Sequence, residues 1–252
     1  MIRVILHGAG GYMGRVVAEA ASADNDIEIV AGIDIADDGS HAFPVFTDID
    51  KCDTPADVVI DFSVAAAIDR LIAFCDRRSL PVVLCTTGLS DEQLDRVKEL
   101  SGRVAVLRSG NMSLGVNTIL SLVQKAAGVF APAGFDMEIV EKHHNRKLDA
   151  PSGTAIMLAD AANEGAGGGY EYVYDRSARR QKRPEKEIGI SAVRGGNIVG
   201  VHEVLFAGTD ETVTITHQAT SRAVFANGAI AAAKFLTDKP AGMYDMMDVI
   251  AS

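Results

Sequence analysis

This sequence contains few cysteines, has less basic than acidic charge, and has no long apolar segment. Only three of its 252 residues are cysteine, and their spacing matches no metal-binding pattern, so reduced thiols are expected at Cys52, Cys75 and Cys85. Lysine and arginine total 24 against 34 aspartates and glutamates, for a formal net charge of -10. Because nucleic-acid binding requires basic stripes, no nucleic-acid partner is expected.

The apolar segments are too short for a membrane span or a signal peptide. No run reaches the roughly 18 to 20 residues that a membrane helix needs. Residues 1–7 are apolar but lead directly into a glycine-rich stretch, with no small-residue cleavage pattern between them. We therefore expect a cytoplasmic protein with no membrane partner. If its ligands are anionic, so acidic a protein must build positive potential locally.

The first half of the chain alternates short apolar segments with helical patterns. Strands are expected at residues 3–7, 28–34, 58–60, 81–84 and 104–107, with helices at 14–23, 65–77 and 91–100. Continuous apolar strands separated by helices are typical of right-handed βαβ units. We predict an α/β protein whose first domain is a Rossmann-like, doubly wound parallel sheet.

The pattern changes after about residue 112. Helices are expected at residues 116–129 and 155–162, strands at 135–141, 199–206 and 211–218, and exposed loops at 162–169 and 175–187. Residues 211–218 alternate apolar and polar, as half-buried antiparallel strands do, and the apolar face of such a sheet needs a cover. A last helix, at residues 223–236, is expected to pack on the first domain.

Two domains follow from this change of pattern. Residues 1–112, completed by 223–252, are expected to form the dinucleotide-binding domain. Residues 113–222 are expected to form a smaller α+β domain with an open mixed or antiparallel sheet, which serves substrate binding and oligomerisation.

A glycine-rich segment, residues 8–14, connects the first predicted strand to the first predicted helix. Glycines permit a sharp turn and close approach to a pyrophosphate, which amides at the helix start then bind. The spacing departs from G-x-G-x-x-G, because Met13 takes the place of the third glycine and Gly14 follows it. Asp34 ends the second strand, where it can bind an adenosine ribose. A plain turn and a solvated carboxylate are the alternatives, but the pair together predicts dinucleotide binding.

The residues after Asp34 favour NADH over NADPH. Asp34 is followed by Ile35, Ala36, Asp37 and Asp38, so no basic residue adjoins it to accept a 2′-phosphate. Repulsion between the carboxylates and that phosphate should disfavour NADPH. Arg15 would weaken the preference if it reached the phosphate, and a surface position on its helix is an equal alternative.

A second segment, residues 138–155, gathers titratable residues. Five of its 18 residues are lysine, arginine or histidine. Ser152 is an expected N-cap, and the amides after it would hold a carboxylate. Proton donors beside an anion site suit the reduction of an anionic unsaturated acid. The paired histidines are alternatively ordinary loop residues. No metal is expected there, because neither H-E-x-x-H nor a cysteine pair supplies further ligands.

This segment resembles the signature of the 4-hydroxy-tetrahydrodipicolinate reductase family. The family pattern, E-x-x-E-x-H-H-x-x-K-x-D-A-P-S-G-T-A, is matched at every fixed position. Other family-like segments occur in the same order, at residues 8–15, 61–63, 86–88, 111–117, 216–222 and 225–229. The resemblance covers residues 2 to about 248.

The resemblance implies a reductase of diaminopimelate and lysine biosynthesis. Such an enzyme reduces 4-hydroxy-tetrahydrodipicolinate (dihydrodipicolinate), a small dicarboxylate, to tetrahydrodipicolinate with NADH or NADPH, and works as a homotetramer. The implied proton donors are His143 and Lys147, while His144, Gly153 and Thr154 would bind the substrate. The cofactor-binding residues that it implies are Gly8, Ala9, Gly10, Gly11, Tyr12, Met13, Asp34, Cys85, Thr86, Thr87, Ser109, Gly110, Asn111 and Met112.

The chain departs from the family at three places. Cys85 replaces a common glycine, Ser109-Gly110 replaces a commoner small pair, and Met112 replaces a frequent phenylalanine. Small or apolar replacements leave backbone contacts to the cofactor intact. Cys85 is expected to be a thiol at the edge of the core, since nothing basic adjoins it.

Two other functions explain part of the sequence. Another NAD(P)-dependent amino-acid or oxo-acid oxidoreductase would account for the glycine-rich segment and Asp34, but not for the pattern at residues 143–155. A non-catalytic dinucleotide-binding module would need a partner-binding motif, such as a basic helix-turn-helix, and none is visible.

Overall fold

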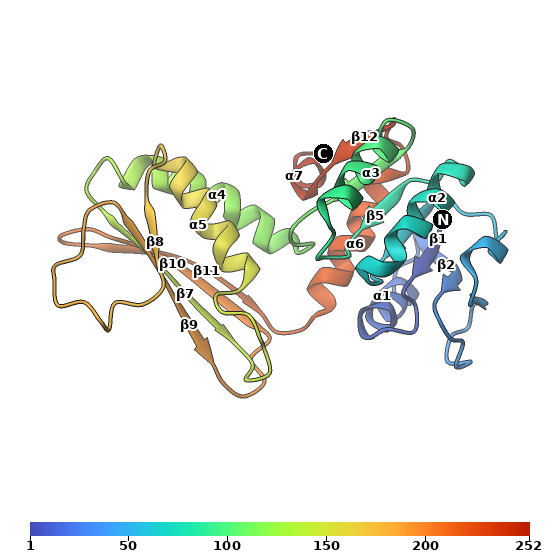
Figure 1. Cartoon of the computed structure of the whole chain (residues 1–252), viewed down its shortest axis with the longest axis horizontal. Coiled ribbons are helices and arrows are strands. Elements are labelled where there is room, and N and C mark those ends of the chain that lie inside the picture. The colour runs from blue at the N-terminus through green and yellow to red at the C-terminus, as the bar shows by residue number, and fades with distance from the viewer. The chain divides into compact units, whose positions relative to one another are not determined.

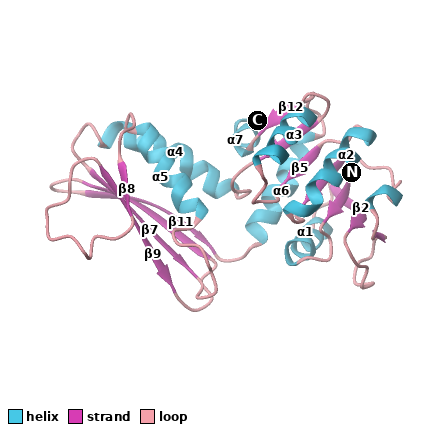
Figure 2. Ribbon diagram, in the orientation of Figure 1, coloured by secondary structure: helices cyan, strands magenta, loops and turns pink.

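A computed structural model describes all 252 residues, which divide into two compact units. Unit 1 comprises Met1–Leu114 and Arg222–Ser252, and unit 2 comprises Gly115–Ser221. The sequence pattern predicts these borders at 112/113 and 222/223. Figure 1 labels the elements along the chain, and Figure 2 separates helices from strands.

Unit 1 contains a seven-stranded sheet in the order β12-β6-β5-β4-β1-β2-β3, in which all neighbours are parallel. The strands are β1 (Ile2–His7), β2 (Ile27–Ile33), β3 (Val45–Phe46), β4 (Val58–Asp61), β5 (Val82–Leu84), β6 (Ala105–Arg108) and β12 (Gly242–Tyr244). The helices are α1 (Tyr12–Ser22), α2 (Ile68–Arg78), α3 (Asp91–Ser101), α6 (Ala223–Leu236) and α7 (Met246–Ala251), with 3-10 turns η1 (Ile49–Lys51) and η2 (Ala65–Ala67).

Helices cover both faces of this sheet (Figure 1). Successive residues of a strand point to opposite faces, so Leu6 and Ile5 of β1 enter different cores. Leu6 packs in a core with Val17 of α1 and Leu236 of α6. Ile5 packs in the other core with residues of α2 and α3 that include Phe74. The predicted doubly wound, Rossmann-like sheet is confirmed.

Unit 2 contains a five-stranded mixed sheet in the order β11-β10-β7-β9-β8. The strands are β7 (Asp136–His143), β8 (Glu171–Val173), β9 (Glu187–Arg194), β10 (Gly200–Ala207) and β11 (Thr212–Ala219), and the helices are α4 (Leu114–Phe130) and α5 (Gly153–Gly165). Strand β10 pairs antiparallel with β7 and β11, whereas β9 pairs parallel with β7 and β8. No helix in either unit has the length and apolar character needed to cross a membrane.

Helices α4 and α5 lie on one face of this sheet (Figure 2). Val123 of α4 and Leu158 of α5 pack there with Ile139 and Phe206 of the sheet. Farther along β7 the same face becomes polar, because Glu141 and His143 follow Ile139 at alternate positions and are also buried. The apolar part anchors the helices, and the polar part carries the candidate site.

Residues 175–186 form the mostly exposed loop that the composition predicts, whereas Glu187 is buried, and three arginines of the loop are held by ion pairs. The guanidinium groups of Arg176 and Arg179 pair with Glu187, which begins β9 and is 1% exposed. Arg176 and Arg183 also pair with Glu138 of β7. The hydrogen bond from Arg179 holds the pKa of Glu187 below its ordinary value, although burial opposes this. Ion pairs with two strands therefore tie this loop down.

Candidate active site

The glycine-rich loop of unit 1 connects the carboxyl end of β1 to α1. Gly8 has a φ of +83°, and a Cβ there would lie 2.6 Å from the carbonyl oxygen of Phe62. A Cβ on Gly14 would lie 2.2 Å from the carbonyl oxygen of Gly8. Both positions therefore require glycine, and Gly14 provides the close loop-to-helix packing expected of a third glycine.

Asp34 lies beside this loop, directly after β2. Its Oδ2 accepts a hydrogen bond from the Gly10 N–H at 2.8 Å, and its Oδ1 accepts one from the Ile35 N–H at 2.7 Å. Gly8, Gly10, Gly11 and Asp34 line a cavity of about 390 Å³. A cavity of this size, with backbone amides and a carboxylate at its wall, fits part of a dinucleotide.

The other residues implied to bind cofactor follow neighbouring strands. Residues 85–87 follow β5, and residues 109–112 follow β6. Because the strands are parallel, their carboxyl ends lie along the same edge of the sheet, where α/β proteins bind ligands. Met112 is buried in a core of unit 1, and Cys85 packs against that core. Burial and then the nearby Asp61 raise the pKa of the Cys85 thiol well above its ordinary value.

A buried polar cluster at this edge was not assigned a role from sequence. Asp61 is fully buried at the end of β4, and its Oδ1 lies 2.7 Å from Nδ1 of His7. Its Oδ2 accepts a hydrogen bond from the Thr86 hydroxyl at 2.6 Å. The cluster joins the ends of β1 and β4 to the loop after β5, so it supports two of the implied cofactor segments. The family-like segment at residues 61–63 was the sequence feature that could have indicated this cluster.

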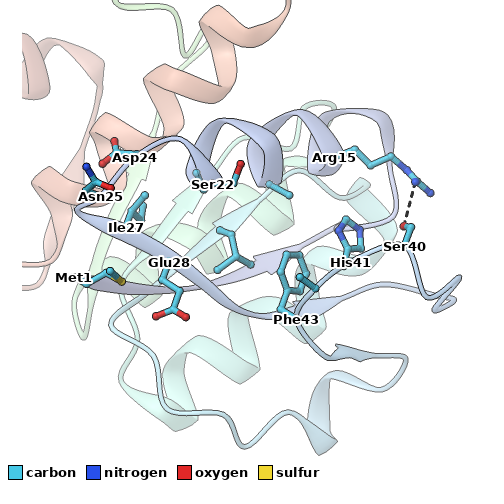
Figure 3. A pocket seen from close by; sticks show the side chains of 14 residues that line it. Met1, Arg15, Ser22, Asp24, Asn25, Ile27, Glu28, Ser40, His41 and Phe43 are labelled. Atoms are coloured by element: carbon cyan, nitrogen blue, oxygen red, sulfur yellow. Dashed lines mark hydrogen bonds between the residues drawn. The ribbon is translucent and has the colours of Figure 1, made fainter.

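A second, larger cavity of unit 1, about 650 Å³, lies between α1 and the loop after β2 (Figure 3). Its lining includes Arg15, Ser40 and His41, but none of the residues implied to bind cofactor. Arg15 donates a hydrogen bond to Ser40 at 3.2 Å and pairs with Asp38 at 2.6 Å. This cavity is therefore not assigned as the cofactor site, although it is the larger of the two. The guanidinium of Arg15 is already paired with the carboxylate of Asp38.

In unit 2, His143 ends β7 and is 8% exposed. Its Nδ1 lies 2.6 Å from Oε2 of Glu141, which is 0% exposed. Residues two apart on a strand share a face, so the sequence E-x-H alone places these side chains together. The Glu141 carboxylate also accepts two hydrogen bonds from Arg194, each 2.7 Å long.

The charge of Glu141 is retained although the side chain is buried. Burial by itself raises the pKa of this carboxyl. Hydrogen bonds from Arg194, His143 and the Ser152 backbone N–H outweigh burial and leave the pKa below its ordinary value. The predicted proton donor His143 therefore lies against a buried anion.

The expected anion-binding helix start is formed by α5. Ser152 is its N-cap, and the serine Oγ accepts a hydrogen bond from the Ala155 N–H at 3.2 Å. Gly153 and Thr154 make the first turn, and a Cβ on Gly153 would meet nothing within 4 Å. Open space thus adjoins the first amides of a helix, which is the arrangement that binds carboxylates.

Lys147 and His144 lie in the segment between β7 and α5. The Lys147 ammonium pairs with Asp149 at 2.9 Å and is 22% exposed. This pairing is the first cause of a pKa of Asp149 below its ordinary value. Arg194 donates a hydrogen bond to the Asp149 carbonyl oxygen at 2.8 Å, so Arg194 connects the turn that carries Lys147 to Glu141. His144 is partly buried directly after β7.

Two histidines beside this cluster were missed as candidates. His202 of β10 is 4% exposed, its Nε2 lies 3.0 Å from the Ser152 Oγ, and its ring centroid lies 5.1 Å from that of His143. Burial, followed by the charge of His143, lowers the pKa of His202 to about 4. Strand pairing places His217 of β11 opposite His202. No group of three or more histidine, cysteine or acidic side chains is arranged to hold a metal ion.

Gly200 of β10 gives the His143 ring its room. A Cβ at this position would lie 3.1 Å from the His143 Nε2. The ring would have to shift by a few tenths of an ångström, so we expect Gly200→Ala to lower kcat/KM about 10-fold. The Kd for NADH, whose implied ligands lie in unit 1, should not change. Steady-state kinetics measure kcat/KM, and fluorescence titration measures the Kd for NADH. Gly195→Ala is the control, because a Cβ there meets nothing, and an equal loss in that variant would contradict the prediction.

Both halves of the chain match models of one family. The model described as "Dihydrodipicolinate reductase, N-terminus" matches residues 2–112, and that described as "Dihydrodipicolinate reductase, C-terminus" matches residues 115–250. A 4-hydroxy-tetrahydrodipicolinate reductase of Caldanaerobacter subterraneus subsp. tengcongensis is 51% identical over 99% of this chain and 98% of its own length. The protein of the same name from Clostridium tetani is 46% identical over 98% and 96%.

Solved structures share the fold. Dihydrodipicolinate reductase from Paenisporosarcina sp. TG-14, a structure with dipicolinate bound, matches with a TM-score of 0.81 and 24% identity over 97% of both chains. A probable dehydrogenase from Thermotoga maritima matches with a TM-score of 0.62 and 12% identity, over 98% of this chain and 92% of its own. The family models and the full-length relatives confirm the resemblance carried by residues 138–155: the chain belongs to the dihydrodipicolinate reductase family.

Proposed function

We propose that this chain reduces 4-hydroxy-tetrahydrodipicolinate to tetrahydrodipicolinate with a nicotinamide cofactor, in diaminopimelate and lysine biosynthesis. The observation that carries the proposal lies in unit 2. There, the hydrogen-bonding network of Glu141 joins His143 of β7 to Ser152 at the start of α5. A proton donor and an anion-binding helix start held by one network suit the reduction of a dicarboxylate.

The helix start and its neighbours would bind the substrate. The amides of Gly153 and Thr154 would hold one carboxylate at the positive end of the α5 dipole. His144 would contact the substrate from the segment after β7. Lys147 would add positive charge beside the dicarboxylate, which answers the need for local positive potential in a chain of net charge -10.

The cofactor would be held by the segments at the carboxyl ends of the unit 1 strands. The backbone of residues 8–13 would approach the pyrophosphate, since a side chain at Gly8 or Gly14 would collide with the backbone. Asp34 would accept hydrogen bonds from the adenosine ribose, and residues 85–87 and 109–112 would line the rest of the cofactor. When bound, the nicotinamide supplies the hydride.

His143 and Lys147 would supply protons. Reduction of the conjugated ring leaves electron density that a neighbouring acid must neutralise, and a protonated imidazole or ammonium can do so. His143 would make the main transfer as proton donor and acceptor, with Lys147 as a second donor. We further propose a cytoplasmic homotetramer, in which the sheet face of unit 2 opposite α4 and α5 provides the contacts between subunits.

We expect NADH to be preferred over NADPH by at least about 10-fold in kcat/KM, because like charges near the 2′-phosphate cost at least about 1.4 kcal/mol. Asp34 is held against Gly10, and Arg15 is already paired with Asp38 at 2.6 Å. Arg70, which lines the same cavity as Asp34, is likewise paired with Asp48 and Asp50. Parallel steady-state kinetics with both cofactors make the measurement. Asp38→Asn removes the acidic partner of Arg15, so it should reduce the ratio of kcat/KM with NADH to kcat/KM with NADPH. An equal kcat/KM for both cofactors, or a higher one for NADPH, in the unaltered chain would contradict the prediction.

The reaction itself is tested with freshly prepared product of dihydrodipicolinate synthase. The absorbance of NADH or NADPH should fall when the chain is added. If neither cofactor is oxidised with this substrate, the proposed function is wrong. A panel of amino and oxo acids in the same assay would reveal a different oxidoreductase, and tight NADH binding without turnover of any acid would indicate a binding module.

A further inference from the structure

We propose that Glu141 is a positioning residue that orients the His143 ring, so that Nε2 is the atom that exchanges a proton with the substrate. The same carboxylate holds the start of α5, because its Oε1 accepts a hydrogen bond from the Ser152 N–H at 3.0 Å. One side chain would thus set the position of the acid relative to the amides that bind the substrate carboxylate. The role of Nε2 in turnover rests on the proposed function, but the orientation of the ring does not.

The hydrogen-bonding roles follow from the charge of Glu141. Its pKa lies below the ordinary value, so the carboxylate is ionised and can only accept hydrogen bonds. The His143 Nδ1, 2.6 Å from Oε2, must therefore carry a hydrogen. A neutral ring then has its lone pair on Nε2, and a protonated ring carries its second hydrogen there. Transfer of that Nε2 hydrogen to the reduced ring would leave a neutral imidazole, which solvent reprotonates.

Stability alone does not explain why this carboxylate is buried. It accepts hydrogen bonds from His143, from both terminal nitrogens of Arg194 and from the Ser152 N–H, and it is 0% exposed. Replacing a buried ion pair with apolar residues of similar volume is often neutral or stabilising. The carboxylate joins β7 to β9 and to the start of α5, and its partners lie around the polar end of the sheet. This arrangement fits orientation of a site better than support of a core.

The charged and polar groups around the Glu141–His143 pair come from three further segments. Arg194 of β9 and the backbone N–H of Ser152, the N-cap of α5, bond to Glu141, and the ring of His202 on β10 lies 5.1 Å from that of His143. The Lys147–Asp149 pair lies in the segment before α5. Burial keeps His202 neutral near pH 7, since its pKa lies at about 4. Glu141 is thus the only carboxylate bonded to the ring, and Arg194 partly offsets its charge.

Two variants and one control distinguish a role of Glu141 in orienting the His143 ring from a role in folding alone. Glu141→Gln keeps the shape but removes the charge, so kcat should fall on the order of 30-fold through misplacement of the acid. Glu141→Gln also leaves Arg194 unpaired and should lower Tm. Arg194→Met combined with Glu141→Gln removes both charges, so Tm should recover while kcat does not.

The matched control is Glu203→Gln. Glu203 lies on β10, opposite Val140 of β7, and pairs with Lys142 at 3.0 Å. Lys142 alternates with the buried Glu141 and His143, so this carboxylate lies on the other face of the same strands. This variant should keep the wild-type kcat. Its oligomeric state is compared with that of the unaltered chain, because this sheet face is the one proposed to make contacts between subunits. If kcat recovers together with Tm in the double variant, Glu141 serves folding only and the proposal is wrong.

A second measurement is independent of turnover. The chain has six histidines, and ¹⁵N-histidine NMR of the unaltered protein, with His143 assigned by His143→Gln, reports which ring nitrogen carries the hydrogen. The proposal requires hydrogen on Nδ1 and none on Nε2 in the neutral ring. The opposite tautomer would overturn it, even in an active enzyme. If the tautomer is correct but no dicarboxylate is reduced, the proposed function fails while the orienting role of Glu141 is retained.

Discussion

Replacement of His143 by glutamine and of Lys147 by alanine in one chain is expected to lower kcat by about 10⁴-fold, the upper end of the loss that follows removal of a positioned acid. The reason is that both implied proton donors disappear together. His143 is held by Glu141 at 2.6 Å, and Lys147 lies in the segment that follows β7. Either acid left alone would still neutralise part of the developing charge, so each single variant should lose less than the double variant.

Single-turnover kinetics with saturating NADH measure this loss without interference from product release. The Kd for NADH should stay within a factor of about 2, because the implied cofactor ligands lie in unit 1. Lys142→Ala is the control, since Lys142 adjoins His143 in sequence but pairs with Glu203 instead. A double variant that keeps more than a tenth of the wild-type kcat would show that neither side chain is an essential acid.

Gly14→Ala is expected to raise the Kd for NADH by about 100-fold, through overpacking that costs up to about 3 kcal/mol. The added Cβ would lie 2.2 Å from the carbonyl oxygen of Gly8 and 2.5 Å from that of Ala9. Both atoms belong to the backbone, so the loop must move away from the helix. Its amides would then lose their alignment with a pyrophosphate.

Isothermal titration calorimetry or fluorescence quenching by NADH measures this effect. Gly102→Ala is the matched control, because Gly102 ends α3 with an ordinary helical φ of -72° and is remote from the loop in sequence. The control should bind NADH normally. An unchanged far-UV circular dichroism spectrum of the Gly14→Ala variant would show that the chain remains folded. Normal NADH affinity in Gly14→Ala would disprove the role assigned to residues 8–14.

Local patterns predict much of this fold. The helix expected at residues 223–236 is found as Ala223–Leu236, and the alternating segment 211–218 is found as Thr212–Ala219. The two-residue β3 was missed, as were β8 and β12, which have three residues each and, unlike the equally short but wholly apolar β5, include a glutamate or a glycine. Strand β9 was missed because charged residues precede it and glycine interrupts its apolar run at Gly189. Pairing with β7, which joins segments far apart in sequence, determines that strand.

The candidate site divides in the same way. The family resemblance names His143 and Lys147, and the two-residue period of a strand explains why Glu141 accompanies His143. Arg194 and His202 depend on the register of β9 and β10 against β7, which places Arg194 beside His143 and His202 beside Glu141. The register of β9 and β10 against β7 cannot be predicted from any local sequence pattern. Ion pairing of residues 176–183 with β7 and β9 is likewise a long-range outcome, so composition predicts the exposed loop but not the pairs that hold it.

Unit 1 is assembled from two separated parts of the chain, and this affects the order in which a growing chain can fold. Leu6 and Val17 share a core with Ala229, Ile230 and Leu236, which leave the ribosome late. At typical synthesis rates about 10 s pass between residues 114 and 236. Unit 2 is continuous and can complete its own core in that interval. The nascent protein should therefore hold a finished inserted unit while the amino-terminal strands still expose apolar side chains, and chaperones that bind such segments have their longest opportunity then.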